Sequence, residues 1–337
     1  MTKLAVNYMG IPLKNPIIVG SSNMVNNPDM LRRLQDAGAS AIVYKSLFEE
    51  QIQLESIQFQ DEMELYNERN AEMISLYPDM QHAGPEEHLL KLKEAKALLD
   101  IPLIGSLNCV FTETWVEYAE LIEKTGVDGL ELNFFSVPRD FTTDAKSIED
   151  EQVSVVEQVC KKVSIPVSVK LSSFYTNPLQ VIKRMEKAGA KAFVLFNRMF
   201  EPDINLDSLQ HSTPFNLSND GDYRLALRYA GVLHGNTNAS ICGANGIYTG
   251  NDVAKMLLAG AESVQIVSAL YKHKPELISD ILNDLEKFME KHNFSNLSDF
   301  RGKLSKANVK DPYIYKRAQY IDLLLHSDQI FKKYPVV

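Results

Sequence analysis

Hydrophobic and polar positions alternate regularly along the chain: a short apolar run of strand length precedes a longer segment with apolar residues at helical spacing, eight times over. The predicted strands cover residues 17–21, 41–46, 102–108, 129–134, 167–171, 192–197, 240–244 and 263–268. The predicted helices cover residues 29–37, 86–98, 114–125, 148–162, 178–188, 222–233, 251–259 and 275–291. Eight such units predict a closed (β/α)8 TIM barrel, because an open doubly wound sheet usually has fewer strands.

Three segments stand apart from this repeat. Residues 1–15 have the pattern of a β-hairpin with Gly10 at its turn, which could close the bottom of the barrel. The connections 47–85 and 199–221 are too long for simple turns and follow the second and sixth predicted strands. Both would lie on the C-terminal face, where long loops usually contact substrate, although the first could instead form a dimer contact. We therefore expect one barrel domain over residues 1–337.

The stretch 239–270 predicts a strand, a glycine-containing turn, a helix and a second strand that leads into another helix. Parallel strands joined by one helix end on the same side, so the backbone N–H groups after Asn245 and after Val267 can converge on an anion. The loops after the last two strands of a barrel commonly bind phosphate. Because any such unit also needs glycines at its turns, the glycines alone leave a phosphate site open.

Polar residues at the C-terminal ends of the predicted strands are informative, because barrel strands are otherwise nearly all apolar. They are Ser21, Ser22, Lys45, Ser46, Ser106, Asn108, Asn133, Lys170, Ser172, Asn197 and Arg198. Each alone could cap a helix or reach solvent. Lys45 and Lys170 lie inside apolar runs, AIVYKS and PVSVKLS, where a buried ammonium needs a partner. Two lysines that face one cavity with a phosphate site favour a flavin nucleotide, whose reduced form a fixed cation stabilises.

Composition narrows the class of protein. Hydrophobic residues make up 45% and charged residues 23% of the chain, and the net charge is −9, which argues against broad nucleic-acid binding. We expect a cytoplasmic protein that does not span a membrane and acts on a small molecule, since neither an apolar run of about 20 residues nor a secretory signal is visible. Three separated cysteines (Cys109, Cys160 and Cys242) and seven histidines without ligand spacing predict neither a disulfide framework nor a metal site.

With these residues in view, the chain resembles the dihydroorotate dehydrogenases, FMN-containing (β/α)8 barrels, and is most similar to their class 1 branch. The segments that carry the resemblance are GIPLKNPIIVGSSNM, IVYKS, GLELNFF, PVSVKLS, LALRYAGVLHG, ICGANGIYTGNDVAKMLLAGAESVQIVSAL and DFRGKL. The resemblance implies an FMN-dependent oxidoreductase of pyrimidine biosynthesis, acting on CH–CH groups. It would pass hydride to FMN from dihydroorotate or a related cyclic or unsaturated acid. The family also implies a homodimer.

The resemblance also assigns residues. The FMN-binding positions would be Gly20, Ser21, Lys45, Ser46, Asn108, Asn133, Lys170, Asn245, Gly246, Val267 and Ser268. Substrate would contact Lys45, Asn133 and Asn197, and Arg198 could add a cation for a carboxylate. The catalytic set would be Ser136, Lys45 and Lys170, with Ser136 at the position of the family's base. Serine is a poor base unless a neighbour accepts its proton, and Ser136 could simply begin a turn.

Some of the family's substrate motifs are altered here. NERNAEMISLYPDM stands where the family has an asparagine-rich loop that clamps orotate, NFFSVPRD replaces NLSCPN, and GANG stands where a double glycine is usual. Two alternatives therefore stay open. One is a flavin-binding barrel with a different substrate or without turnover. The other is a sugar-phosphate aldolase or isomerase that uses Lys170 for Schiff-base chemistry.

Overall fold

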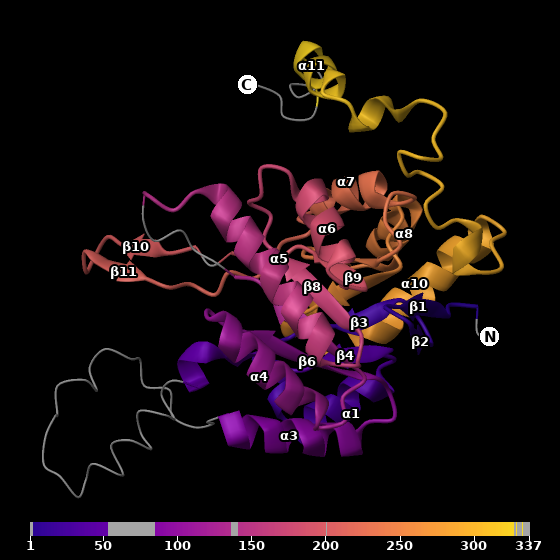
Figure 1. The fold of residues 1–337 in the computed structure, drawn as a ribbon. Coiled ribbons are helices and arrows are strands. Elements are labelled where there is room, and N and C mark those ends of the chain that lie inside the picture. The colour runs from indigo at the N-terminus through magenta and orange to yellow at the C-terminus, as the bar shows by residue number, and fades with distance from the viewer. Residues whose placement is uncertain are drawn as a thin grey trace, which may run out of the picture.

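The computed structural model describes residues 3–52, 85–135, 141–199 and 201–326, together with Asp328 and Lys332. Parallel strands form a closed barrel surrounded by helices (Figure 1). In ring order the eight barrel strands are β3 (Ile17–Val19), β4 (Ala41–Val43), β6 (Leu103–Asn108), β7 (Gly129–Asn133), β8 (Val167–Leu171), β9 (Ala192–Leu195), β12 (Ser240–Ala244) and β13 (Ser263–Ile266). Pairing of β4 with β6 and of β13 with β3 closes the ring, and β5 (Leu47–Phe48) adds a short strand beside β6. The predicted (β/α)8 barrel is confirmed.

Nine helices in the described part of the chain surround the barrel. They are α1 (Pro28–Asp36), α3 (Pro85–Leu98), α4 (Thr112–Glu123), α5 (Ala145–Lys162), α6 (Pro178–Lys187), α7 (Arg224–Leu233), α8 (Gly250–Ala259), α9 (Ser268–His273) and α10 (Leu277–Lys291). Of these, α1, α5, α6 and α8 begin at a residue whose side chain caps the helix. The side chains of Asn27 and Asn177 cap α1 and α6, each followed by proline at the first helical position. Thr249 and Asp252 form a capping box at the start of α8.

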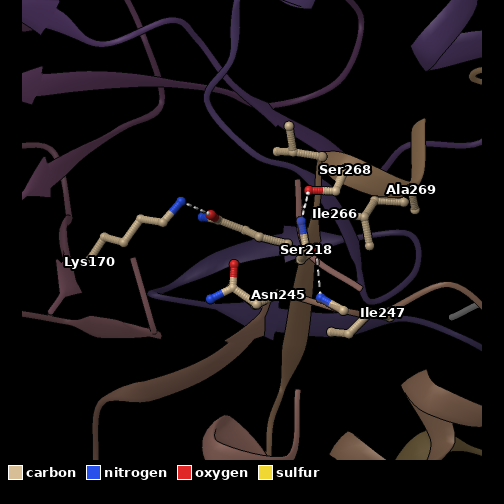
Figure 2. A pocket seen from close by; sticks show the side chains of 11 residues that line it. Lys170, Ser218, Asn245, Ile247, Ile266, Ser268 and Ala269 are labelled. Carbon is tan, nitrogen blue, oxygen red and sulfur yellow. Dashed lines mark hydrogen bonds between the residues drawn. The ribbon is translucent and has the colours of Figure 1, made fainter. Parts of the chain in front are cut away.

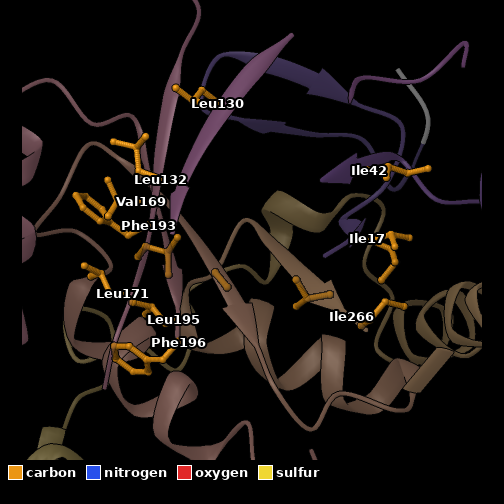
Figure 3. Packing of buried hydrophobic residues seen from close by; sticks show 14 of the residues in the cluster. Ile17, Ile42, Leu130, Leu132, Val169, Leu171, Phe193, Leu195, Phe196 and Ile266 are labelled. Atoms are coloured by element: carbon orange, nitrogen blue, oxygen red, sulfur yellow. The ribbon is translucent and has the colours of Figure 1, made fainter. Parts of the chain in front are cut away.

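The strand residues divide into two hydrophobic cores, because successive side chains point to opposite faces. Large outward side chains pack against the helices in one core, and Figure 3 shows several of them, including Leu132, Phe193 and Ile266. Smaller inward side chains fill the barrel with the N-terminal hairpin in the second core. The inward strand residues are Ile18, Ala41, Val43, Ile104, Ala192, Val194, Cys242 and Ala244. Because side chains alternate between the two faces, every second position near the C-terminal ends of the strands can carry a polar group toward the barrel axis.

The N-terminal hairpin pairs β1 (Val6–Tyr8) with β2 (Ile11–Leu13), as the sequence predicts. Its two-residue turn uses positive φ angles at Met9 (46°) and Gly10 (93°), which match the twist of the paired strands. Tyr8 is fully buried in the barrel core, and the backbone N–H of Met9 donates a 3.0 Å hydrogen bond to Ser240 Oγ. The hairpin therefore closes the N-terminal end of the barrel.

The connection 199–221 contains a second hairpin, β10 (Asp203–Asn205) with β11 (Gln210–Ser212). Its residues are mostly exposed, so no hydrophobic alternation predicts these two strands. Of the connection 47–85, residues 53–84 lie outside the described part of the chain. Short 3-10 turns at Asn23–Asn26, Leu297–Asp299 and Pro312–Tyr315 complete the described elements. The last turn leads to α11 (Ala318–Leu325), which projects away from the barrel (Figure 1). Among the described residues, no helix combines the length and apolar character needed to cross a bilayer.

Candidate active site

A pocket opens at the C-terminal ends of β8, β12 and β13. Its wall combines the lysine predicted from the β8 pattern with the turn after β12 and the first residues of α9 (Figure 2). The lining residues are Lys170, Ser218, Ala244, Asn245, Gly246, Ile247, Gln265, Ile266, Val267, Ser268 and Ala269. The structure therefore brings Lys170 together with the predicted phosphate cradle.

The turn after β12 has two successive residues with positive φ, Asn245 at 68° and Gly246 at 63°. Asparagine tolerates this left-handed conformation better than most residues, which explains how it can stand where the resemblance led us to expect glycine. Its Nδ2 also donates a 2.9 Å hydrogen bond to the carbonyl oxygen of Phe196. Gly246, in contrast, cannot be replaced by a residue with a side chain without a clash, because a Cβ there would lie 2.4 Å from the carbonyl oxygen of Asn219.

Ser218 completes the cradle and was missed by the sequence analysis. It is only 3% exposed, and its backbone N–H donates to Ser268 Oγ at 3.0 Å. Its own hydroxyl accepts from the backbone N–H of Gly246, also at 3.0 Å. The sequence offers no signal for this role beyond the position of Ser218 in the long connection after β9.

Lys170 lies beside the predicted substrate contacts. Its Nζ donates a 3.2 Å hydrogen bond to Gln265 Oε1, and its Cα is in register with that of Asn133 on β7. Asn197 Nδ2 donates to Asn133 Oδ1 at 2.7 Å, and the backbone N–H of Asn197 donates to the carbonyl oxygen of Leu171. Strands β7, β8 and the end of β9 thus present two carboxamides and one ammonium group side by side.

A chain of serine hydroxyls joins the ends of β3, β4 and β6. The hydroxyls of Ser46 and Ser106 are 2.6 Å apart, and those of Ser21 and Ser46 are 3.2 Å apart. Ser21 Oγ also accepts from the backbone N–H of Ser46, which fixes the two loops to each other. Asn108, the last residue of β6, is buried close to the same strand end. Three predicted cofactor contacts, Ser21, Ser46 and Asn108, thus lie with Ser106 along one polar edge of the mouth.

Gly20 allows β3 to approach β13 closely. A Cβ at this position would lie 2.8 Å from Val267 Cγ2 and 3.2 Å from Gln265 Oε1. Val267 and Gln265 both line the pocket with Lys170. The glycine predicted from the family resemblance therefore has a physical role in this chain, since any larger residue would push against the pocket wall.

Lys45 follows the inward residues Ala41 and Val43 at strand spacing, but it does not line the pocket that contains Lys170. It is half-buried, and burial together with the nearby Lys91 lowers the pKa of its ammonium group. His88 on α3 is also close, and burial with the charges of Lys45 and Lys91 lowers the pKa of His88 to about 4. The two predicted lysines are therefore not joined in one described pocket.

The Arg198 side chain binds residues of the connection that follows it in the chain, Asn216 and Asp222. Its guanidinium donates to the side-chain and backbone oxygens of Asn216 and forms a 2.8 Å ion pair with Asp222. The structure thus gives this predicted substrate contact a clamping role on the connection after β9.

Burial and nearby Glu49 and Glu50 raise the pKa of the Cys109 thiol well above its usual range, which disfavours it as a base.

Ser136, the predicted catalytic base, lies outside the described residues. Glu131 and Gln265 are two buried polar residues inside the barrel that the sequence analysis did not select. The signal was present, because each lies within an apolar run, GLELN and VQIV, as Lys170 does. Among the described residues, no group of three or more His, Cys, Asp or Glu side chains is arranged to hold a metal ion.

Enzymes built on a closed parallel barrel frequently hold a phosphate-bearing ligand at the C-terminal mouth, where this chain places Lys170, Asn245 and Gly246 around one pocket. The family model for dihydroorotate dehydrogenase matches residues 3–289, and the chain belongs to the dihydroorotate dehydrogenase family. It is 28% identical over 311 residues to the catalytic subunit of dihydroorotate dehydrogenase B (NAD(+)) of Thermoplasma volcanium, covering 90% of this chain and 98% of that protein.

Other relatives carry a second activity in their names. The chain is 25% identical over 332 residues to the chloroplastic dihydropyrimidine dehydrogenase (NADP(+)) of Arabidopsis thaliana, which covers 89% of this chain and 76% of that protein. It is 23% identical over 322 residues to the NAD-dependent dihydropyrimidine dehydrogenase subunit PreA of Escherichia coli, with the same coverage of 89% and 76%. The family is flavin-dependent, and this chain is a dihydroorotate dehydrogenase-like oxidoreductase acting on CH–CH groups. The Schiff-base aldolase alternative is not favoured.

Proposed function

We propose that this chain binds FMN and oxidises dihydroorotate or a closely related cyclic acid. The observation that carries the proposal is the placement of Lys170 in the same pocket as the turn at Asn245 and Gly246 and the start of α9. The residues fit a flavin nucleotide. A Cβ at Gly246 would collide with the loop at Asn219 and one at Gly20 would collide with Val267, so the two glycines let these backbone segments pack closely around the pocket, and the Lys170 ammonium group lies across it from Asn245.

Each group would have a distinct part in holding FMN. Asn245, Gly246 and Ser268 would bind the phosphate through the turn after β12 and the start of α9. Gly20, Val267 and the hydroxyls of Ser21 and Ser46 would lie along the rest of the cofactor, with Asn108 at the β6 end. Lys170 would place its positive charge at the edge of the isoalloxazine system where negative charge develops on reduction. When bound, FMN supplies the acceptor for a hydride.

The substrate would lie against the carboxamides of Asn133 and Asn197, which already contact each other. Amide groups can donate to carbonyl oxygens and accept from ring N–H groups, so this pair suits a pyrimidine ring. Lys45 would hold a substrate carboxylate from the β4 side. Ser136 would remove a proton from the substrate carbon adjacent to the one that gives up hydride.

A neutral dihydropyrimidine is the second candidate substrate. It is favoured by the engagement of Arg198, whose guanidinium is already bound by Asp222 and Asn216 and so is not free for a carboxylate. The names of the relatives from Arabidopsis thaliana and Escherichia coli point in the same direction. Comparison of dihydroorotate with dihydrouracil would separate the two.

We infer a cytoplasmic homodimer, which the family resemblance supports, in which residues 1–337 of each chain form one FMN-binding domain. Sedimentation at several protein concentrations tests the dimer. A single calorimetric unfolding transition, displaced upward as a whole by FMN, tests the single domain.

An anaerobic spectral titration tests the function. We expect purified protein to be yellow and dihydroorotate to bleach the flavin absorbance. Lys170→Ala should weaken FMN binding or its reduction, whereas Ser136→Ala should slow bleaching while FMN stays bound. Lys191→Ala is the matched control, because Lys191 is exposed next to the opposite end of β9. A colourless protein that does not take up added FMN would contradict the proposal.

A further inference from the structure

Gln265 lies between two opposite charges inside the barrel. Its Oε1 accepts the 3.2 Å hydrogen bond from Lys170 Nζ, and its Nε2 donates a 2.5 Å hydrogen bond to Glu131 Oε2. Lys170 and Glu131 belong to the neighbouring strands β8 and β7, whereas β13 is separated from β8 by β9 and β12. The Gln265 side chain therefore reaches across the barrel interior to join them.

The chemistry of the three groups fixes the direction of these bonds. An ammonium group can only donate, so it requires the amide oxygen, and the amide NH2 is left to face the carboxyl group. Glu131 is 0% exposed and Gln265 is 3% exposed, so water does not screen the arrangement. Burial raises the pKa of Glu131, while Lys170 and Gln265 act to lower it.

We propose that Gln265 is a positioning residue, a spacer that prevents Lys170 from pairing directly with Glu131 and so keeps the ammonium charge directed at the pocket. A direct ion pair in the interior would cancel most of the field that either charge exerts on a ligand. With a neutral amide between them, the positive charge stays on the pocket wall, where Lys170 is found (Figure 2). For the flavin this inference rests on the proposed function.

A purely structural role for Gln265 makes a different prediction. If Gln265 only filled space, its replacement would disturb the pocket to the same degree whether or not Glu131 were present. If Gln265 is a spacer, the damage depends on Glu131, because the carboxylate is what draws Lys170 away. Removal of the carboxylate should then restore the pocket even without the amide.

The test uses the full-length protein and four comparisons. Gln265→Met removes both hydrogen bonds with little change in side-chain length, and Glu131→Gln removes the negative charge while keeping an acceptor for Gln265. The double variant combines them, and Ser263→Ala, also buried on β13, is the control. The readouts are the FMN dissociation constant from flavin fluorescence and the midpoint potential of bound FMN.

We expect Gln265→Met to raise the FMN dissociation constant about tenfold, the size expected for loss of one charge-assisted contact, and to shift the midpoint potential to a more negative value. Glu131→Gln and Ser263→Ala should stay close to wild type, and the double variant should recover toward it. Equal losses in the single and double variants, or no loss in Gln265→Met, would overturn the spacer role. If Gln265→Met does not fold, Gln265→Glu decides: it should lose affinity without rescue by Glu131→Gln, and wild-type affinity would contradict the role.

A second readout needs no cofactor. The rate at which trinitrobenzenesulfonate labels Lys170 can be followed by peptide mass spectrometry, because the reagent attacks only the free amine. We expect slower labelling in Gln265→Met, where the amine is held in an ion pair, and recovery in the double variant. Wild-type protein that binds no FMN would contradict the proposed function, and the labelling rates would then decide the spacer role alone.

Discussion

The backbone N–H of Gly246 donates a 3.0 Å hydrogen bond to the hydroxyl of Ser218, a residue 28 positions earlier in the chain. This bond ties the long connection after β9 to the turn after β12. The backbone N–H of Ser218 in turn donates to Ser268 Oγ, so one serine joins both halves of the cradle. The shape of the pocket therefore depends on a loop that is not part of the barrel repeat.

Gly246→Ala should disrupt this junction. The residue has a φ of 63°, and the new Cβ would lie 2.4 Å from the carbonyl oxygen of Asn219 and 2.6 Å from the backbone nitrogen of Asp222. We expect a loss of roughly 2–4 kcal/mol in unfolding free energy, from backbone strain and displacement of the loop, and loss of FMN affinity. Urea unfolding and FMN titration measure both.

Gly126→Ala is the matched control for this change. Gly126 also has a positive φ, 86°, but its Cβ would meet no atom within 4 Å. Gly126→Ala should therefore lower the unfolding free energy only by the strain of the left-handed conformation, about 1–2 kcal/mol, and leave FMN affinity unchanged. Equal effects of the two alanines would show that the contact with the loop is unimportant.

Asn245→Gly and Asn245→Ala separate two contributions at the neighbouring position. The glycine variant keeps the φ of 68° but loses the hydrogen bond to Phe196, which should cost roughly 0.5–1.5 kcal/mol. The alanine variant loses the bond and adds left-handed strain, so its cost should be about 1–2 kcal/mol greater. Urea midpoints at constant m-value check this order, and equal stability of the two variants would refute it.

The ion pair between Arg198 and Asp222 predicts that the two residues act together on the loop. Arg198→Ala and Asp222→Asn should each weaken the clamp by roughly 1–2 kcal/mol and speed proteolysis within residues 199–221. Arg33→Ala, which breaks an exposed pair with Glu276 elsewhere, should not change this cleavage. A raised KM for substrate in Arg198→Ala alone, with normal Asp222→Asn, would instead identify Arg198 as a substrate contact.

His88 predicts loss of stability in acid. Its pKa is about 4 in the folded protein, because burial and two nearby lysines oppose protonation, against about 6.5 in an unfolded chain. Between these values the unfolded state binds more protons, so the unfolding free energy rises with pH. Neutral His88 contributes roughly 3 kcal/mol to the unfolding free energy. This contribution is fully present above pH of about 6.5 and is lost as the pH falls toward about 4.

The variant His88→Gln removes this titration. Its stability should therefore fall less than that of wild type between pH of about 6.5 and 4, as measured by urea unfolding at each pH. His211→Gln, at an exposed position on β11, should follow the wild-type curve. Parallel curves for wild type and His88→Gln would rule out a buried neutral imidazole at this position.

The barrel could be predicted from sequence because its signal repeats. Each strand is an apolar run and each helix has apolar residues at helical spacing, so single errors do not change the topology. The strand ends were less accurate: β4 ends at Val43 and β9 at Leu195, although the apolar runs suggested residues 46 and 197. Polar residues such as Ser46 and Asn197 leave the strand ladder there and bond through their side chains or loop backbone.

The candidate site was only partly predictable for a related reason. Lys170 and Gly246 belong to local patterns, whereas Ser218 acts through contacts with Gly246 and Ser268 that no local pattern encodes. Arg198 was selected from its position at a strand end, which predicted a ligand contact. In the folded protein its guanidinium instead bonds to Asn216 in the following loop. Side-chain pairing across the barrel, as in Gln265, is set by the closed ring and not by neighbours in sequence.

The N-terminal hairpin has a consequence for the order in which this chain can assemble during translation. Its turn is fixed by a hydrogen bond between Met9 and Ser240, which are 231 residues apart, and β3 next to it pairs with β13. The hairpin is synthesised before these strands, so it gains these contacts only after β12 and β13 have been made. Because contacts of such long separation slow folding, a nascent chain truncated before β12 should leave Tyr8 accessible to labelling, and completion of β13 should protect it.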